Sequence, residues 1–176
     1  MAPLVKHAIT WTLRDMEKKT EGSCRIYPLI INHKFADLQL VPSDCTEITA
    51  PFEPTQVIEG KYLMALNLTD EIYQRLAEIE AQIQSLVAVK HPGLEWTSSL
   101  HAPEKYPASL RVKMYAAVQV YDDEDKQVPP PSSWRRFSLI PIIRPSAWAH
   151  EKSAGVWWNL VAVKLSKPLP RTYTFI

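Results

Sequence analysis

Basic and aromatic side chains alternate along residues 110–165, and they are the side chains of this sequence best suited to bind a ligand. Lysine and arginine neutralise phosphates and release counterions, and flat rings stack on unpaired bases at roughly 1–3 kcal/mol per base, whatever the base. A strand directs successive side chains to opposite faces, so neighbouring strands can present cations and rings on one surface. This segment therefore predicts a surface for a charged polymer with flat bases, such as a single-stranded nucleic acid.

Ten residues are the candidates for contact with nucleic acid. The cations expected to contact phosphates are Arg111, Lys113, Arg135, Arg136, Arg144 and Lys164. The rings expected to stack on bases are Tyr115, Tyr121, Trp148 and Trp158. Each has an ordinary alternative, because tryptophans in strands are more often core and charged residues usually face water. Trp157 and Trp158 are adjacent, so in a regular strand at most one of them lies in the main core.

Motifs for catalysis are absent. The sequence has no glycine-rich phosphate loop, no G-x-S-x-G and no H-E-x-x-H, and its five histidines and two cysteines lack zinc-ligand spacing. The acidic run Asp122–Asp125 is the one candidate for a magnesium-dependent nuclease, but it lacks the glycine and final glutamate of a calcium loop. We interpret it as a solvated hairpin turn and expect no enzyme activity, no cofactor and no metal.

The composition is that of one folded domain without a general attraction for polyanions. Of 176 residues, 46% are hydrophobic and 22% are charged, and the net charge is +1. A nucleic-acid site must therefore come from local clustering of cations. Because the sequence has neither a signal peptide nor an apolar stretch of transmembrane length, we expect an intracellular protein. Its two cysteines, Cys24 and Cys45, are then expected to be reduced.

Strands are the elements that must position the candidate residues. Earlier strands are predicted at 4–13, 24–34 (an edge or bulged strand because of Pro28), 35–41 and 61–68, with irregular connections at 42–60 and 94–109. The clearest alternation is in 110–121, whose inward face would carry Leu110, Val112, Met114, Ala116, Val118 and Val120. Residues 129–136 indicate a stiff extended segment. Two apolar extended segments follow at 137–144 and 145–151, broken by Pro141 and Pro145. A final strand is predicted at 153–165.

One helix is predicted over residues 70–90. Thr69 or Asp70 can cap its start, and His91-Pro92-Gly93 ends it. Its apolar stripe consists of Ile72, Leu76, Ile79, Ile83, Leu86 and Val87. In a chain with this much strand pattern, the stripe is expected to pack on a sheet rather than on a partner protein.

The segment 110–165 resembles the C-terminal half of viral single-stranded-DNA-binding proteins with an OB fold, those of T7-like phages and large eukaryotic DNA viruses. The shared features are a strand that ends in an aromatic residue and an acidic turn, an S-x-W, and a closing strand of the form G-V-x-W-x-L-x-x-V-K-L. Here these are Tyr121-Asp122, Ser146-Ala147-Trp148 and Gly155–Leu165. The family is also similar in having a helix inserted between barrel strands. Its acidic tail has no counterpart in the ending PLPRTYTFI.

We therefore predict a mainly β (α+β) protein, an OB-like antiparallel β-barrel with one long inserted helix and proline-rich loops. Residues 1–176 would form one domain with an extended tail at 166–176. The predicted function is non-catalytic, sequence-tolerant binding of single-stranded DNA in replication, recombination or repair, at the site of viral DNA replication if the protein is viral. RNA binding, replication-protein partners and a homodimer stay open, and no membrane partner is expected. The alternative is a structural virion or coat protein with a β-sandwich.

Overall fold

The computed structural model of the protein describes residues 11–14, 24–31, 34–41 and 47–166. The expectations for residues 4–10 and for Cys45 lie outside these residues. So does the predicted tail, except for Ser166, which is the last residue of a strand. Among the described residues, no helix is both long and apolar enough to cross a membrane.

Five strands form a closed barrel, which confirms the predicted mainly β, OB-like fold. They are β5 (Ile48–Thr49), β7 (Lys61–Asn67), β10 (Ser109–Tyr121), β12 (Ser138–His150) and β13 (Ser153–Ser166). The ring closes because β12 pairs with both β5 and β13, while β7 pairs with β5 and β10, and β10 with β13. The β10–β13 pairing is parallel and the other four are antiparallel, so the predicted antiparallel barrel has one parallel seam.

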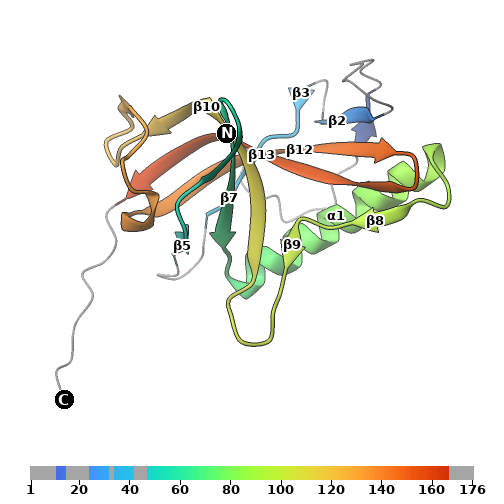
Figure 1. Cartoon of the computed structure of the whole chain (residues 1–176), viewed down its shortest axis with the longest axis horizontal. Helices are drawn as coiled ribbons and strands as arrows, with labels where there is room; N and C mark the ends of the chain where they lie inside the picture. Colours follow the sequence, from blue (N-terminus) through green and yellow to red (C-terminus); the bar gives the residue numbers. More distant parts are fainter. Residues whose placement is uncertain (1–10, 15–23, 32–33, 42–46, 167–176) are drawn as a thin grey trace.

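Shorter strands extend the barrel at its margins. They are β1 (Thr12–Leu13), β2 (Arg25–Ile31), β3 (Lys34–Phe35), β4 (Leu38–Gln39), β6 (Thr55–Ile58), β8 (Glu95–Thr97), β9 (Leu100–His101) and β11 (Gln127–Val128). The first four lie on the β12 side, as Figure 1 shows for β2 and β3. β2 has strands on both sides, so it is not the edge strand that Pro28 suggested; Pro28 is the last residue of β2 to pair with β12.

β12 is one strand of 13 residues, so the prediction of two pieces broken at Pro141 and Pro145 is wrong. Both prolines fall between the residues of β12 that pair with β5, β4 and β2. The carbonyl of Pro141 accepts from Leu40 N–H at 2.9 Å, so its ring nitrogen also faces that side and away from β13. A proline costs a strand little where no neighbour needs its missing N–H.

Three other connections are more ordered than predicted. The segment 42–60 contains β5, which pairs with β12 and β7, and β6, which pairs with β7. Residues 129–136 are not extended throughout, because Trp134–Arg136 form a short 3-10 helix, η1. Glu53 holds its start, accepting from Ser133 Oγ at 2.6 Å and from Trp134 N–H at 3.0 Å. The segment 94–109 contains β8 and β9, which pair with β13 and β10 respectively.

The predicted helix is confirmed as α1 (Asp70–Lys90), with Thr69 as its N-cap. The Thr69 hydroxyl accepts from Ile72 N–H at 3.3 Å. The helix packs against β12 and β13, and Figure 1 shows β8 running beside it. Trp96 Nε1 also donates to Glu80 at 3.1 Å. The apolar stripe therefore packs on the sheet, with Ile72, Leu76, Ile83 and Val87 buried and Ile79 and Leu86 partly buried.

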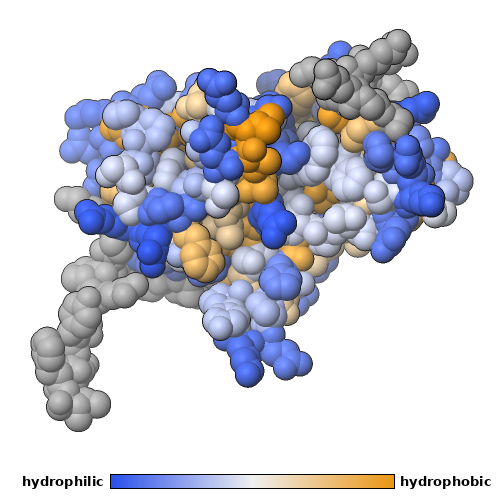
Figure 2. Space-filling view, in the orientation of Figure 1, coloured by the Kyte–Doolittle hydropathy of each residue, from blue (hydrophilic) through white to orange (hydrophobic). Residues whose placement is uncertain are grey.

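The barrel strands separate a buried face from an outer face. Of the predicted inward face of β10, Leu110, Val112, Met114 and Val120 are buried, whereas Val118 is half-buried and Ala116 is exposed. The register of β10 and β13 shifts between Met114 and Gln119, which explains the interruption. Figure 2 shows a mostly hydrophilic surface with small apolar patches. The outer face, defined by the paired row Leu63, Lys113, Asn159 and Arg144, is where the site lies.

Candidate nucleic-acid interface

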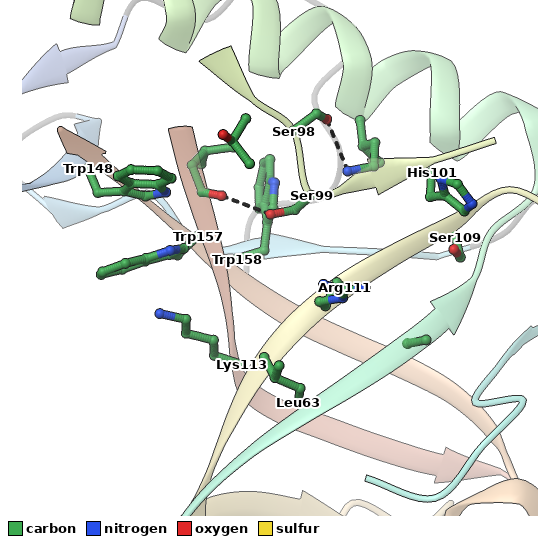
Figure 3. A pocket seen from close by; sticks show the side chains of 14 residues that line it. Leu63, Ser98, Ser99, His101, Ser109, Arg111, Lys113, Trp148, Trp157 and Trp158 are labelled. Atoms are coloured by element: carbon green, nitrogen blue, oxygen red, sulfur yellow. Dashed lines mark hydrogen bonds between the residues drawn. The ribbon is translucent and has the colours of Figure 1, made fainter. Parts of the chain in front are cut away.

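An open pocket of about 440 Å³ lies on the outer face where β10 and β13 diverge. The segment β8–β9 fills the gap between them: Thr97 pairs with Gly155 of β13, and Leu100 pairs with Leu110 of β10. Figure 3 shows side chains from β7, β8, β9, β10, β12 and β13 around this space. The parallel seam of the barrel therefore creates the pocket.

Lys113 is the central cation of the pocket. It lies two residues beyond the exposed Arg111, so both side chains are on the outer face of β10. Its Nζ is 3.2 Å from the centroid of the Trp157 ring, a cation–π contact. Partial burial, and secondarily repulsion by Lys61, lowers the pKa of Lys113 to about 8, while Cys24 acts in the opposite direction. Lys113 is still mostly protonated at pH 7.

Trp148 and Trp157 form an aromatic stack on one side of the pocket. Their ring centroids are 5.8 Å apart and the planes are inclined by 24°. Gly155 pairs with Trp148 across the β12–β13 hairpin. A Cβ at position 155 would lie 2.9 Å from the Trp148 ring and 2.5 Å from the Thr97 carbonyl oxygen. Glycine is therefore required for β8 and Trp148 to approach β13 this closely.

The opposite wall is polar and is held by hydrogen bonds. Ser99 Oγ donates to the Val156 carbonyl at 2.9 Å, and Ser98 Oγ accepts from Leu100 N–H at 3.1 Å (Figure 3). The Ser99 carbonyl accepts from Arg111 N–H at 3.0 Å. The pocket thus combines a fixed hydroxyl-bearing wall, two cations and two stacked rings.

Four of the predicted residues border this pocket: Arg111, Lys113, Trp148 and Trp158. Trp158 borders it from within the core and offers no exposed ring face. The stacking role predicted for Trp158 is contradicted, because its ring has no exposed area and its Nε1 is buried without a hydrogen-bond acceptor among the described residues. Trp157 lies on the outer face instead. The rule that adjacent tryptophans cannot both be core is confirmed: the partly exposed ring is that of Trp157, whereas the sequence prediction chose Trp158 for stacking.

The pocket also contains residues that sequence reasoning missed. Besides Trp157, these are Leu63, Ala65, Thr97, Ser98, Ser99, Leu100, His101, Ser109 and Val156. Trp157 could have been found from the alternation of β13, because it is in phase with the polar Asn159 whereas Trp158 is in phase with Leu160. The serines carry no comparable signal.

The remaining candidates lie elsewhere on the molecule. Tyr115 is 45% exposed and continues the outer face of β10 beyond Lys113, with its ring centroid 6.0 Å from Lys61 Nζ. Tyr121 and Lys164 pair at the far end of β10 and β13, where Lys164 bonds to Asp125 at 2.8 Å. Two further exposed cations, in η1, do not line the pocket: Arg135 and Arg136.

Arg144 lies in the same row as Lys113 but is already paired. Its Nε and one Nη donate to the two carboxylate oxygens of Asp37 at 2.6 and 2.9 Å. Hydrogen bonding to Asp37 raises the pKa of the guanidinium, which also stacks 4.4 Å from the centroid of the Phe35 ring. Its charge is thus neutralised within the chain.

The acidic run Asp122–Asp125 is a hairpin turn between β10 and β11, as predicted. Asp122 Oδ1 accepts from Glu124 N–H and Lys126 N–H, both at 2.9 Å. Glu124 bonds to Lys126 at 2.6 Å. Within the part of the chain that the structure describes, no three potential ligands are grouped as a metal site.

Comparison with known proteins finds likeness in structure and not in sequence. No protein-family model matches the chain, and no curated protein matches it. The single-stranded-DNA-binding protein gp2.5 of bacteriophage T7 superposes with a TM-score of 0.58 at 15% identity, over 81% of this chain and 91% of that chain.

A second phage protein gives a similar result. The single-stranded-DNA-binding protein of bacteriophage Enc34 has a TM-score of 0.53 at 12% identity, over 93% of this chain and 96% of that chain. The same protein in complex with single-stranded DNA has a TM-score of 0.52 at 12% identity, over 92% of this chain and 98% of that chain. At these identities the likeness establishes the fold alone: this chain has the OB-like fold of phage single-stranded-DNA-binding proteins.

Proposed function

We propose that this protein binds single-stranded DNA without sequence selectivity and without catalysis, in replication, recombination or repair. The whole chain would act as one OB-like domain. The observation that carries the proposal is the pocket in which Arg111 and Lys113 meet the Trp148–Trp157 stack on the open face of the barrel. The cations suit phosphates and the rings suit bases.

The arrangement favours single strands over duplexes. In a duplex the bases are already stacked and paired, so a ring in a pocket gains a base only after paying for unstacking. An unpaired base enters at no such cost. Stacking on tryptophan and charge neutralisation depend little on base identity, so binding should tolerate any sequence.

Two further observations support the proposal. The structural neighbours are named as single-stranded-DNA-binding proteins, and one was solved with single-stranded DNA. The acidic run Asp122–Asp125 was the one feature of the sequence that suggested a nuclease. Asp122 accepts hydrogen bonds within the turn, and Glu124 and Asp125 form ion pairs with Lys126 and Lys164. This supports binding without catalysis.

Tryptophan fluorescence, titrated with oligo-dT at low salt, tests the proposal. The wild-type protein should be quenched by oligo-dT and much less by a duplex of equal length. The double variant Arg111→Ala/Lys113→Ala should bind at least tenfold more weakly, because hydrogen bonds to charged groups contribute about 1.5–3 kcal/mol each. Lys126→Ala, which also removes a cation but at the far turn, should bind as the wild type. The proposal is overturned if oligo-dT causes neither fluorescence quenching nor a mobility shift at low salt.

A further inference from the structure

Trp157 has both faces of its ring covered in the free protein. One face stacks on Trp148 and the other lies under Lys113 Nζ, and Figure 3 shows the Trp157 ring between these two side chains. A base therefore cannot stack on Trp157 unless one cover leaves.

The two covers differ in how easily they move. Trp148 is wedged against Gly155, with no room even for a methyl group between them. Lys113 reaches Trp157 with the end of a flexible four-carbon chain, and its ammonium can swing while its stem stays in place. The free energy of stacking a base is of the same order as that of the cation–π contact it would replace. The displaced ammonium can in addition pair with a backbone phosphate.

We propose that a nucleobase takes the face of Trp157 that Lys113 covers, and that Lys113 moves from the ring to the backbone phosphate in the same step. This inference rests on the proposed function and adds a mechanism to it. Lys113 is then a positioning residue: it keeps the ring face covered in the free protein and fixes the phosphate next to the stacked base.

The ionisable groups around Lys113 predict that the exchange, and with it the affinity for DNA, depends on pH. The ionisable groups that act on it are Lys61 of β7, which favours its neutral form, and Cys24 next to β2, which favours its charged form. Arg111 precedes it by two residues on the same strand and also lines the pocket. A phosphate contact raises the pKa of Lys113 above its free value of about 8. Affinity should then be constant below pH 8 and fall by up to tenfold per pH unit between the free and the bound pKa.

Lysine-selective NMR with ¹³C-labelled lysine tests the movement directly in the wild-type protein. Over the Trp157 ring, the Lys113 ε-methylene protons should resonate far upfield, and Lys113→Arg identifies the signal by removing it. Saturating oligo-dT should return the signal to the ordinary lysine position. A signal that stays upfield while DNA is bound would overturn the inference.

Affinity for oligo-dT between pH 7 and pH 9.5, at constant ionic strength, provides the second test. The wild type should lose affinity above pH 8. The variant Lys113→Arg should not, because arginine keeps its charge over this range while the neighbouring Lys61 and Cys24 are unchanged. Equal pH curves for the two proteins would also contradict the exchange. Failure of both proteins to bind at any pH would instead overturn the proposed function.

Discussion

Adjacent tryptophans in β13 occupy opposite environments. The Trp158 ring is completely buried in the barrel, while Trp157 lies between Trp148 and Lys113 on the outer face. Trp158→Ala should therefore lower the free energy of unfolding by about 3–5 kcal/mol. Trp157→Ala should change stability much less but weaken binding of single-stranded DNA by about 1–3 kcal/mol. Urea denaturation and oligo-dT titration of both variants measure this contrast.

The reverse outcome would contradict the assignment of the two rings. If Trp157→Ala unfolds the protein while Trp158→Ala only weakens binding, the face assignment of β13 is wrong. The two substitutions delete the same atoms from neighbouring positions, so each is the matched control of the other.

Residue type alone could not separate these two tryptophans. Both are large and amphipathic, and each is equally plausible as core or as stacking platform. The phase of the strand separates them, because the direction of Trp157 follows from the polar Asn159 and that of Trp158 from Leu160. Arg111 and Lys113 were found for this reason, since their strand alternates cleanly up to Met114.

Arg144 shows how a neighbouring element can remove a cation from a predicted site. It lies on β12 in the row of Lys113, but Asp37, between β3 and β4, neutralises it. Asp37→Asn should leave Arg144 in place over Phe35 and free its charge for a phosphate. Affinity for oligo-dT should then rise several-fold at low salt, with a loss of at most about 1 kcal/mol of stability from a partly exposed pair.

A double-mutant cycle in the same titration checks the role of Arg144. Arg144→Ala should weaken binding somewhat in the wild-type chain, because it leaves the Asp37 carboxylate unpaired, whereas in Asp37→Asn it should only cancel the gain. Unchanged affinity in Asp37→Asn would mean that DNA does not reach this part of the outer face.

Elements with a strong local pattern were predicted, and elements defined by distant partners were not. α1 has a cap and an apolar stripe within its own residues, so its bounds follow from the sequence. β8 has only three residues and exists because Thr97 pairs with Gly155, far along the chain. β12 continues through two prolines because its neighbours on one side, β5, β4 and β2, are short and leave gaps at the prolines. This reason lies in the neighbouring strands and not in the sequence of β12.

The barrel as a whole was predictable, but the pocket was not. Alternating strands and one inserted helix define the class of fold. The pocket depends on the parallel seam between β10 and β13 and on the β8–β9 segment that fills it, and both arise only when the barrel closes. This explains why its two cations and Trp148 were predicted while its serine wall was missed.

At the scale of the whole molecule, the low net charge and the ion pairing of several cations confine the proposed interaction with DNA to the pocket. The chain carries a net charge of only +1, and Lys126, Arg144 and Lys164 are each paired with a carboxylate. Arg111 and Lys113 are left to neutralise about two phosphates in the pocket.

The salt dependence of binding should accordingly be shallow. For single strands the slope of log affinity against log salt is about −0.7 per phosphate, so two phosphates predict about −1.4, or roughly a sevenfold loss between 50 and 200 mM salt. Asp37→Asn should steepen the slope by about 0.7, because it adds one cation. Oligo-dT titrations across this salt range measure both values. A wild-type slope near −4 would mean that the strand contacts many cations outside the pocket, including the exposed pair Arg135 and Arg136, and that binding is not confined to the parallel seam.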